Sequence, residues 1–75
     1  MSAHLRKRSL ILSGHDTSVA LENEFWLVLE HIAAHKKQPL PVLVASVDSA
    51  RTPTQSLASA LRVYALKSVQ AQVAG

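Results

Sequence analysis

The chain has no cysteine, so no disulfide bond can stabilise it. Its 75 residues form one domain at most, and so short a chain buries only about 60–65% of its unfolded surface. No apolar run approaches the ~18 residues of a membrane span, and no hydrophobic signal-peptide region follows the N-terminal cations. These absences indicate a small cytoplasmic protein, not bound to a membrane, that gains its missing core by oligomerisation.

Acidic residues are also scarce. Five of them against eight Lys and Arg give a net charge of +3, so a symmetric dimer would carry about +6. The cations gather at residues 6–8 and at Lys36–Lys37. A basic N-terminal segment often holds DNA phosphates, although the same composition also suits a solvated tail. We expect residues 1–7 to form a basic flexible arm, residues 8–69 a single domain and residues 70–75 a frayed tail.

A short strand is expected immediately before the first helix. Val19 and Leu21 lie two positions apart and therefore share one face of a strand. From residue 23 onward the apolar residues recur every three or four positions, which is the spacing of one helix face. A strand of about five residues cannot be stable without a paired neighbour. A second copy of the chain is the simplest such neighbour, so the pattern predicts a homodimer.

The segment Ser9–Leu12 is a second candidate strand, because Leu10, Ile11 and Leu12 are all apolar. Gly14 tolerates a positive φ, and His15–Asp16 would complete a turn or short loop. The sequence leaves open whether this segment folds back as a hairpin or reaches across to the partner subunit.

Three helices follow. The second opens with Pro39 and Pro41, which a helix tolerates only in or before its first turn. Its β-branched content leaves a strand as the alternative, although helix is favoured. Ser56 is suited to cap the third helix. The expected helices span about residues 23–35, 40–49 and 54 or 56 to 69.

The run from residue 7 to Trp26 follows a pattern that is fairly specific. It reads K-R-S, two apolar residues in alternation, then G-H-x-T-S-V-x-L-E-x-x-F-W. This run resembles the ribbon-helix-helix superfamily, the Arc/MetJ type of DNA-binding dimer, and more closely a small alphaproteobacterial-type subfamily of it. The resemblance extends over roughly residues 6–67. It implies a mainly α fold with short N-terminal β segments and an additional C-terminal helix, arranged as an intertwined homodimer.

The resemblance also implies a function. In the superfamily, strands from two chains form a ribbon in the major groove, with one face toward base edges and the other toward the dimer core. Here the outward positions would be Asp16, Ser18 and Ala20, which read bases poorly. Pro39 and Pro41 remove backbone donors from the helix start that normally grips a phosphate. The expectation is a transcription regulator that binds duplex DNA with weak base selectivity.

The candidate residues fall into two groups. His15 could bond either a phosphate or a backbone carbonyl, and the structural role is favoured. Trp26 cannot share a helix face with Phe25, so we expect it at the flank, under the third helix or at the dimer contact. The expected DNA-contacting residues are Arg6, Lys7, Arg8, His15, Asp16, Ser18, Ala20, Lys36 and Lys37. The expected dimer core consists of Val19, Leu21, Phe25, Trp26, Leu29, Ile32, Leu43, Val44 and Val47.

Other chemistry has little support. His31 and His35 have a metal-compatible i, i+4 spacing, but a closed site needs three or four ligands. No serine has an ordered base nearby. We expect no metal, no cofactor and no enzymatic activity. The alternative function is a dimer of this fold that does not bind DNA and binds a protein partner instead, as an antitoxin or a scaffold does. Whether two dimers join into a tetramer stays open for either function. DNA binding is favoured if Arg6–Arg8 and Asp16–Ala20 lie on one exposed face of the dimer, and the protein partner if Ser9–Leu12 covers the ribbon face.

Overall fold

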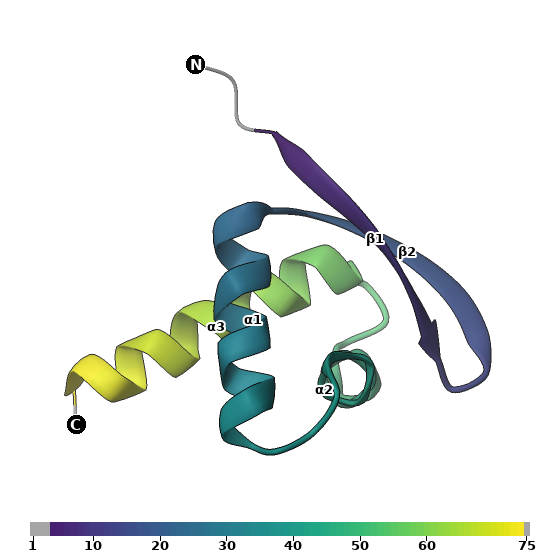
Figure 1. Ribbon diagram of the computed structural model, residues 1–75. Coiled ribbons are helices and arrows are strands. Elements are labelled where there is room, and N and C mark those ends of the chain that lie inside the picture. The colour runs from purple at the N-terminus through teal and green to yellow at the C-terminus, as the bar shows by residue number, and fades with distance from the viewer. Residues whose placement is uncertain (1–3, 75) are drawn as a thin grey trace.

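The computed structural model describes residues 4–74 and contains a two-stranded ribbon followed by three helices (Figure 1). This mainly helical architecture is the one predicted from the sequence. The elements are β1 (Leu5–Leu12), β2 (His15–Glu22), α1 (Asn23–His35), α2 (Leu40–Ala50) and α3 (Leu57–Ala74).

The ribbon is a hairpin within one chain. β1 pairs antiparallel with β2, from Leu5 opposite Glu22 to Leu12 opposite His15. Ser13 and Gly14 form the turn with φ angles of 52° and 83°, and two successive positive φ angles match the twist of paired strands. His15, expected in the turn, therefore already belongs to β2. Ser9–Leu12, for which the sequence left both possibilities open, therefore folds back within the chain, and pairing of β2 with a second chain along its other edge stays a prediction.

β1 also begins earlier than predicted. Leu5, Arg6 and Lys7 belong to the strand, although we expected them in a flexible arm. The reason is the length of β2, whose last residues offer backbone partners to all three of these positions. Residues 1–3 of the expected arm lie outside the described residues.

The helices largely follow the sequence pattern. α1 has the predicted bounds, and α2 is a helix, with Pro39 as its N-cap and Pro41 in its first turn. The hydroxyl of Ser56 accepts a hydrogen bond from the backbone N–H of Ser59 at 3.1 Å, as expected of a cap. α3 continues to Ala74, so the expected fraying of residues 70–74 is not seen. These residues are Gln, Ala and Val without a helix breaker, which explains the continuation.

The core lies between the inner face of the ribbon and the three helices. Leu10, Leu12, Val19 and Leu21 contribute from the ribbon, and each is at most 7% exposed. Within residues 4–74 no polar or charged residue is buried. The largest fully buried side chains are Trp26, Leu21, Leu29, Leu43, Leu61 and Val44.

The roles expected of the adjacent aromatic residues are reversed. Trp26 is 2% exposed and shares the core stripe of α1 with Leu29, whereas Phe25 is only partly buried at the flank. The hairpin lies over α1 on the side of Trp26 and thereby selects which of the two side chains becomes core. Since adjacent helix positions are about 100° apart, one of the two must turn away.

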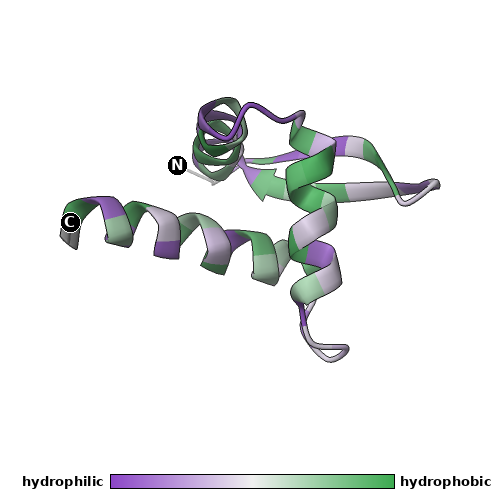
Figure 2. Cartoon of the chain, turned by 90° about the horizontal axis from the view of Figure 1, so that it is seen from below, coloured by the Kyte–Doolittle hydropathy of each residue, from purple (hydrophilic) through white to green (hydrophobic). Residues whose placement is uncertain are grey.

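The C-terminal half of α3 projects from the rest of the molecule (Figures 1 and 2). Leu66, Val69 and Val73 are therefore 55%, 41% and 83% exposed. No helix among residues 4–74 has the length and apolar character needed to cross a membrane.

Candidate nucleic-acid interface

The outer face of the ribbon is open. Asp16 and Ser18 are exposed while Val19 and Leu21 are buried, as the predicted alternation requires. β1 pairs beside β2 at its edge and does not cover this face. The hydroxyls of Ser9 and Ser18, on opposite strands, lie 3.4 Å apart. The outer face is thus accessible, and it carries Ser9, Asp16 and Ser18 together with the apolar Ile11, which is 65% exposed. Ser9–Leu12 does not cover this face, so the arrangement expected for a protein partner is not seen.

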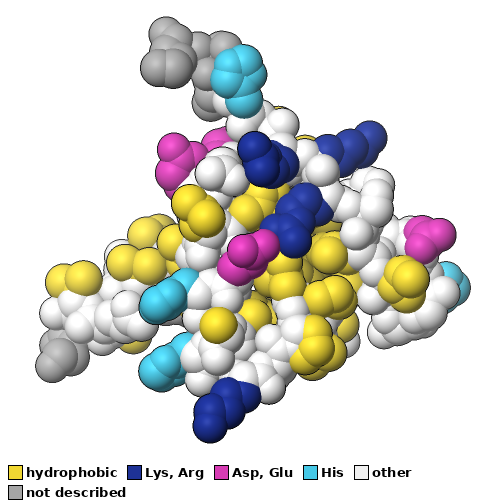
Figure 3. Space-filling view, in the orientation of Figure 1, with side chains coloured by type: hydrophobic (Ala, Val, Ile, Leu, Met, Phe, Trp, Pro, Cys, Tyr) yellow, Lys and Arg dark blue, Asp and Glu magenta, His cyan; other side chains and the backbone are white. Residues whose placement is uncertain are grey.

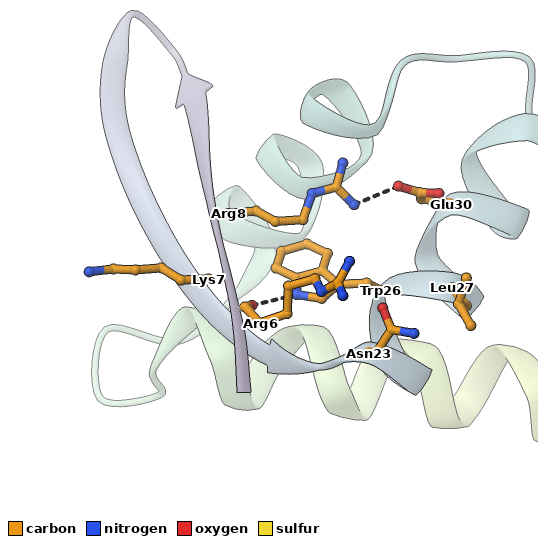
Figure 4. A pocket seen from close by; sticks show the side chains of 7 residues that line it. All are labelled: Arg6, Lys7, Arg8, Asn23, Trp26, Leu27 and Glu30. Atoms are coloured by element: carbon orange, nitrogen blue, oxygen red, sulfur yellow. Dashed lines mark hydrogen bonds and ion pairs between the residues drawn. The ribbon is translucent and has the colours of Figure 1, made fainter. Parts of the chain in front are cut away.

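The three N-terminal cations do not share one face. Lys7 points to the side of β1 away from α1, whereas Arg6 and Arg8 point toward α1 (Figure 4). Alternation along a strand causes this division. Lys7 therefore stands beside Ala20 on the outer side of the hairpin, since these two residues are paired in the register.

Arg8 is held by the fold. Its guanidinium carbon lies 5.0 Å from the centre of the Trp26 ring, and Nη1 forms an ion pair with Glu30 of α1 (Figure 4). The indole Nε1–H of Trp26 donates a hydrogen bond of 2.8 Å to the backbone oxygen of Arg6. These contacts fasten β1 to α1. They also commit Arg8, predicted to contact DNA, to a partner within the protein.

A cavity of about 350 Å³ opens between β1 and α1 beside these contacts. The exposed Arg6 side chain reaches it, and within residues 4–74 the guanidinium has no acceptor. Its walls are formed by Arg6, Lys7, Arg8, Asn23, Trp26, Leu27 and Glu30. Sequence reasoning did not propose Asn23, Leu27 or Glu30, because no short-range pattern links them to the basic segment.

The second cationic group lies elsewhere. Lys36 and Lys37 follow the C-terminal end of α1, and α1 begins at the ribbon, so its length separates them from β1 (Figure 1). Dark-blue side chains accordingly occur both beside the ribbon and at the opposite end of the face in Figure 3. The Lys36 ammonium lies 5.9 Å from the centre of the Tyr64 ring.

The start of α2 offers few donors to an anion. Pro41 has no backbone N–H, and Val42 and Leu43 donate theirs to the carbonyl of Pro39 at 3.1 and 3.3 Å. Of the first four residues of α2, only Leu40 has a backbone N–H that is not donated within the described part of the chain. The predicted weakness of this phosphate contact thus agrees with the local hydrogen bonding.

The end of β2 carries a further ion pair that the sequence did not reveal. Nε of Arg62 on α3 donates to Oε1 of Glu22 at 3.0 Å, and the Arg62 guanidinium carbon lies 5.8 Å from the centre of the Phe25 ring. Hydrogen bonds from its own backbone and from Arg62 hold the pKa of Glu22 below its usual value. α3 is thereby attached to the junction of β2 and α1.

The remaining candidates stand apart. His15 is exposed next to the turn and makes no side-chain hydrogen bond to another described residue. His31 and His35 belong to no group of three or more metal-ligating side chains within residues 4–74.

The model of the ribbon-helix-helix domain family matches residues 5–69, from the first strand nearly to the end of α3. The chain belongs to the ribbon-helix-helix family. Proteins with this domain are generally DNA-binding transcription regulators, usually dimeric and typically not enzymes. No curated protein and no solved structure matches the chain.

Proposed function

We propose that this ribbon-helix-helix protein is a transcription regulator that binds duplex DNA as a homodimer. The observation that carries the proposal is the open outer face of the hairpin, where Lys7, Ser9 and Ser18 are exposed together. The two β2 strands of such a dimer would form the ribbon that fits the major groove, whose width admits two strands. Lys7 supplies a charge for the backbone, and the serine hydroxyls supply donors and acceptors for base edges.

Base selectivity is expected to be weak. Ser9 and Ser18 accept and donate without preference, and Ala20 offers only a methyl group. Asp16, exposed at the turn end of β2, repels phosphate. Most of the affinity therefore comes from cations near the backbone, which makes binding strongly dependent on salt.

The dimer is proposed to form along the free edge of β2. The sheet has only two strands, so each strand of the described hairpin has one edge without a ladder partner. Pairing of β2 with β2 of a second copy would extend the ribbon across a two-fold axis. The residues expected in the dimer core, such as Leu29 and Leu43, are already buried within one chain. They therefore stabilise each subunit, and the contact between the two subunits is left to the free edge of β2.

Lys36 and Lys37 contribute separately. They lie about 20 Å from the start of α1 by the rise of a 13-residue helix. We assign them to the DNA backbone outside the groove that the ribbon occupies, where they act as point charges.

The test is the binding of fluorescently labelled random-sequence duplex DNA, followed by anisotropy from about 50 to about 300 mM salt. We expect tight binding at low salt and a steep loss of affinity with salt. Lys7→Ala should flatten the slope by about 1.8, since it removes one phosphate contact from each of the two subunits. Lys67→Ala, which removes an exposed cation of α3, is the matched control and should leave the slope nearly unchanged.

A second candidate function rests on α3. Its projecting half exposes Leu66, Val69 and Val73, which lie along one stripe of the helix and suit a protein partner. If the wild-type protein fails to bind DNA at about 50 mM salt, the DNA proposal is wrong and this interaction module takes its place. Leu66→Glu should then abolish retention of the partner by the immobilised protein, while the fold stays intact.

A further inference from the structure

The cavity between β1 and α1 combines features that no role described above uses. Arg6 and Asn23 are exposed at its mouth, and neither side chain has a hydrogen-bond partner within residues 4–74. Leu27, also at the mouth, is 59% exposed. The site thus offers one full positive charge, one amide donor and one apolar surface, all on rigid elements.

The interior wall of the cavity is already neutralised and fixed. Glu30 is paired with Arg8, and Arg8 lies over the Trp26 ring, so the charges of this pair cancel. The Trp26 indole fixes the backbone of Arg6 through its hydrogen bond. The backbone from which the Arg6 side chain extends is therefore anchored, and this side chain lines the cavity together with Asn23 (Figure 4). Anchoring lowers the entropy that binding must overcome.

We propose that this cavity is a subsite for one phosphodiester group of the DNA backbone. The Arg6 guanidinium and the Asn23 amide donate to the phosphate oxygens, and Leu27 packs against the adjoining sugar. The ligand class follows from the donors, because a guanidinium matches the geometry of phosphate oxygens and binds them with charge-assisted hydrogen bonds. The inference rests on the DNA binding proposed above and gives it a defined backbone contact. This contact compensates for the donors that Pro39 and Pro41 remove from α2.

Two changes of opposite direction test the site through DNA affinity. Asn23→Asp places a negative charge at the mouth and should weaken random-duplex binding about tenfold for each of the two subunits, the worth of one charge-assisted hydrogen bond apiece. Glu30→Gln frees Arg8 toward the cavity and should strengthen binding about threefold, with a steeper salt slope. Both variants are expected to fold, since both residues are exposed on α1.

Charge-matched controls separate the site from the overall charge of the protein. Glu24→Gln makes the same change in net charge as Glu30→Gln, but Glu24 faces a hollow on the α3 side of α1. Gln70→Glu matches the charge change of Asn23→Asp on the distant part of α3. Each control should change the affinity for DNA less than half as much as the site variant with the same charge change. Equal effects within each pair would overturn the subsite and leave DNA binding standing.

A second measurement does not depend on DNA. Trp26 is the only tryptophan, and its indole N–H is bonded to the residue that carries the cation. Titration with inorganic phosphate at constant ionic strength should shift the indole N–H resonance in a saturable way, and Asn23→Asp should abolish the shift. If DNA does not bind but phosphate does, the cavity takes a free phosphate and the backbone assignment is wrong. A resonance that stays unchanged up to about 50 mM phosphate, well into the range of weak anion sites, would show that the cavity is not a phosphate site.

Discussion

The inner and outer faces of the hairpin carry different side chains on the same backbone. On the inner face Leu10, Val19 and Leu21 are at most 7% exposed, and they pack on all three helices. On the outer face Lys7 and Ser18, at the alternate positions, are exposed. A step of one residue along a strand therefore separates the side chains that stabilise the fold from those available for binding.

The largest effect should come from the inner face. Leu21→Ala is expected to lower the free energy of unfolding by about 2–5 kcal/mol, because the vacated volume is fully enclosed. So small a domain has little stability to lose, so the variant should be largely unfolded. Urea denaturation followed by circular dichroism measures the loss. An unchanged midpoint would contradict the division between the faces.

A smaller loss of stability should follow from Trp26→Phe, which removes the hydrogen bond between the ribbon and α1 but does not leave the core empty. The variant keeps an aromatic ring but leaves the Arg6 carbonyl without the indole donor, at a cost of about 1–3 kcal/mol. Hydrogen exchange should speed up more at Leu5–Arg8 than at the turn end of β1. Uniform acceleration along β1 would show that the indole bond does not fasten this end in particular.

The ion pair of Glu22 predicts a dependence on pH. The folded pKa of Glu22 is lowered, so its contribution to stability is present above the ordinary value near 4.3 and is lost as the pH falls through the folded value. Arg62→Gln removes one cause of the lowered pKa of Glu22, so the variant should lose less stability than the wild-type protein as the pH falls. Unfolding midpoints of both proteins between about pH 3 and about pH 6 provide the measurement. Parallel curves for the two proteins would rule out this pair as a source of acid sensitivity.

The smallest effect on stability is expected on the outer face. Ser18→Arg should change the free energy of unfolding by less than about 0.5 kcal/mol, because Ser18 is exposed. The added guanidinium should increase DNA affinity, since it stands on the face that we propose enters the groove. Denaturation and DNA anisotropy on the same sample compare the two properties. A destabilisation comparable to that of Leu21→Ala would remove the distinction between the faces.

Local patterns predicted much of this fold. The bounds of α1, the helical state of α2 and the alternation of β2 all follow from spacings of two to four residues. The pairing of Leu5 with Glu22 and of Arg8 with Glu30 joins residues 17 and 22 positions apart, and no local period encodes such contacts. For the same reason the sequence did not reveal the cavity, whose walls come from β1 and α1 together.

The exchange of Phe25 and Trp26 has a similar cause. Both are large aromatic residues, and both fit a helical spacing with Leu29. The position of the ribbon decides between them, and the indole bond to Arg6 is made by the residue that faces the ribbon. The basic segment was likewise recognised from composition, but its division between the two sides of β1 required the start of the strand at Leu5.

The turn at Ser13–Gly14 has a consequence for the order of assembly. A hairpin closed by two residues forms within about 1–10 μs, and its rate does not depend on protein concentration. Encounter between two chains is far slower, because association rate constants are commonly about 10⁵–10⁷ M⁻¹s⁻¹. Each newly made chain therefore completes its ribbon before it meets another copy. In the dimer proposed above, assembly would then be the docking of two finished subunits, and dilution would separate them without unravelling the strands.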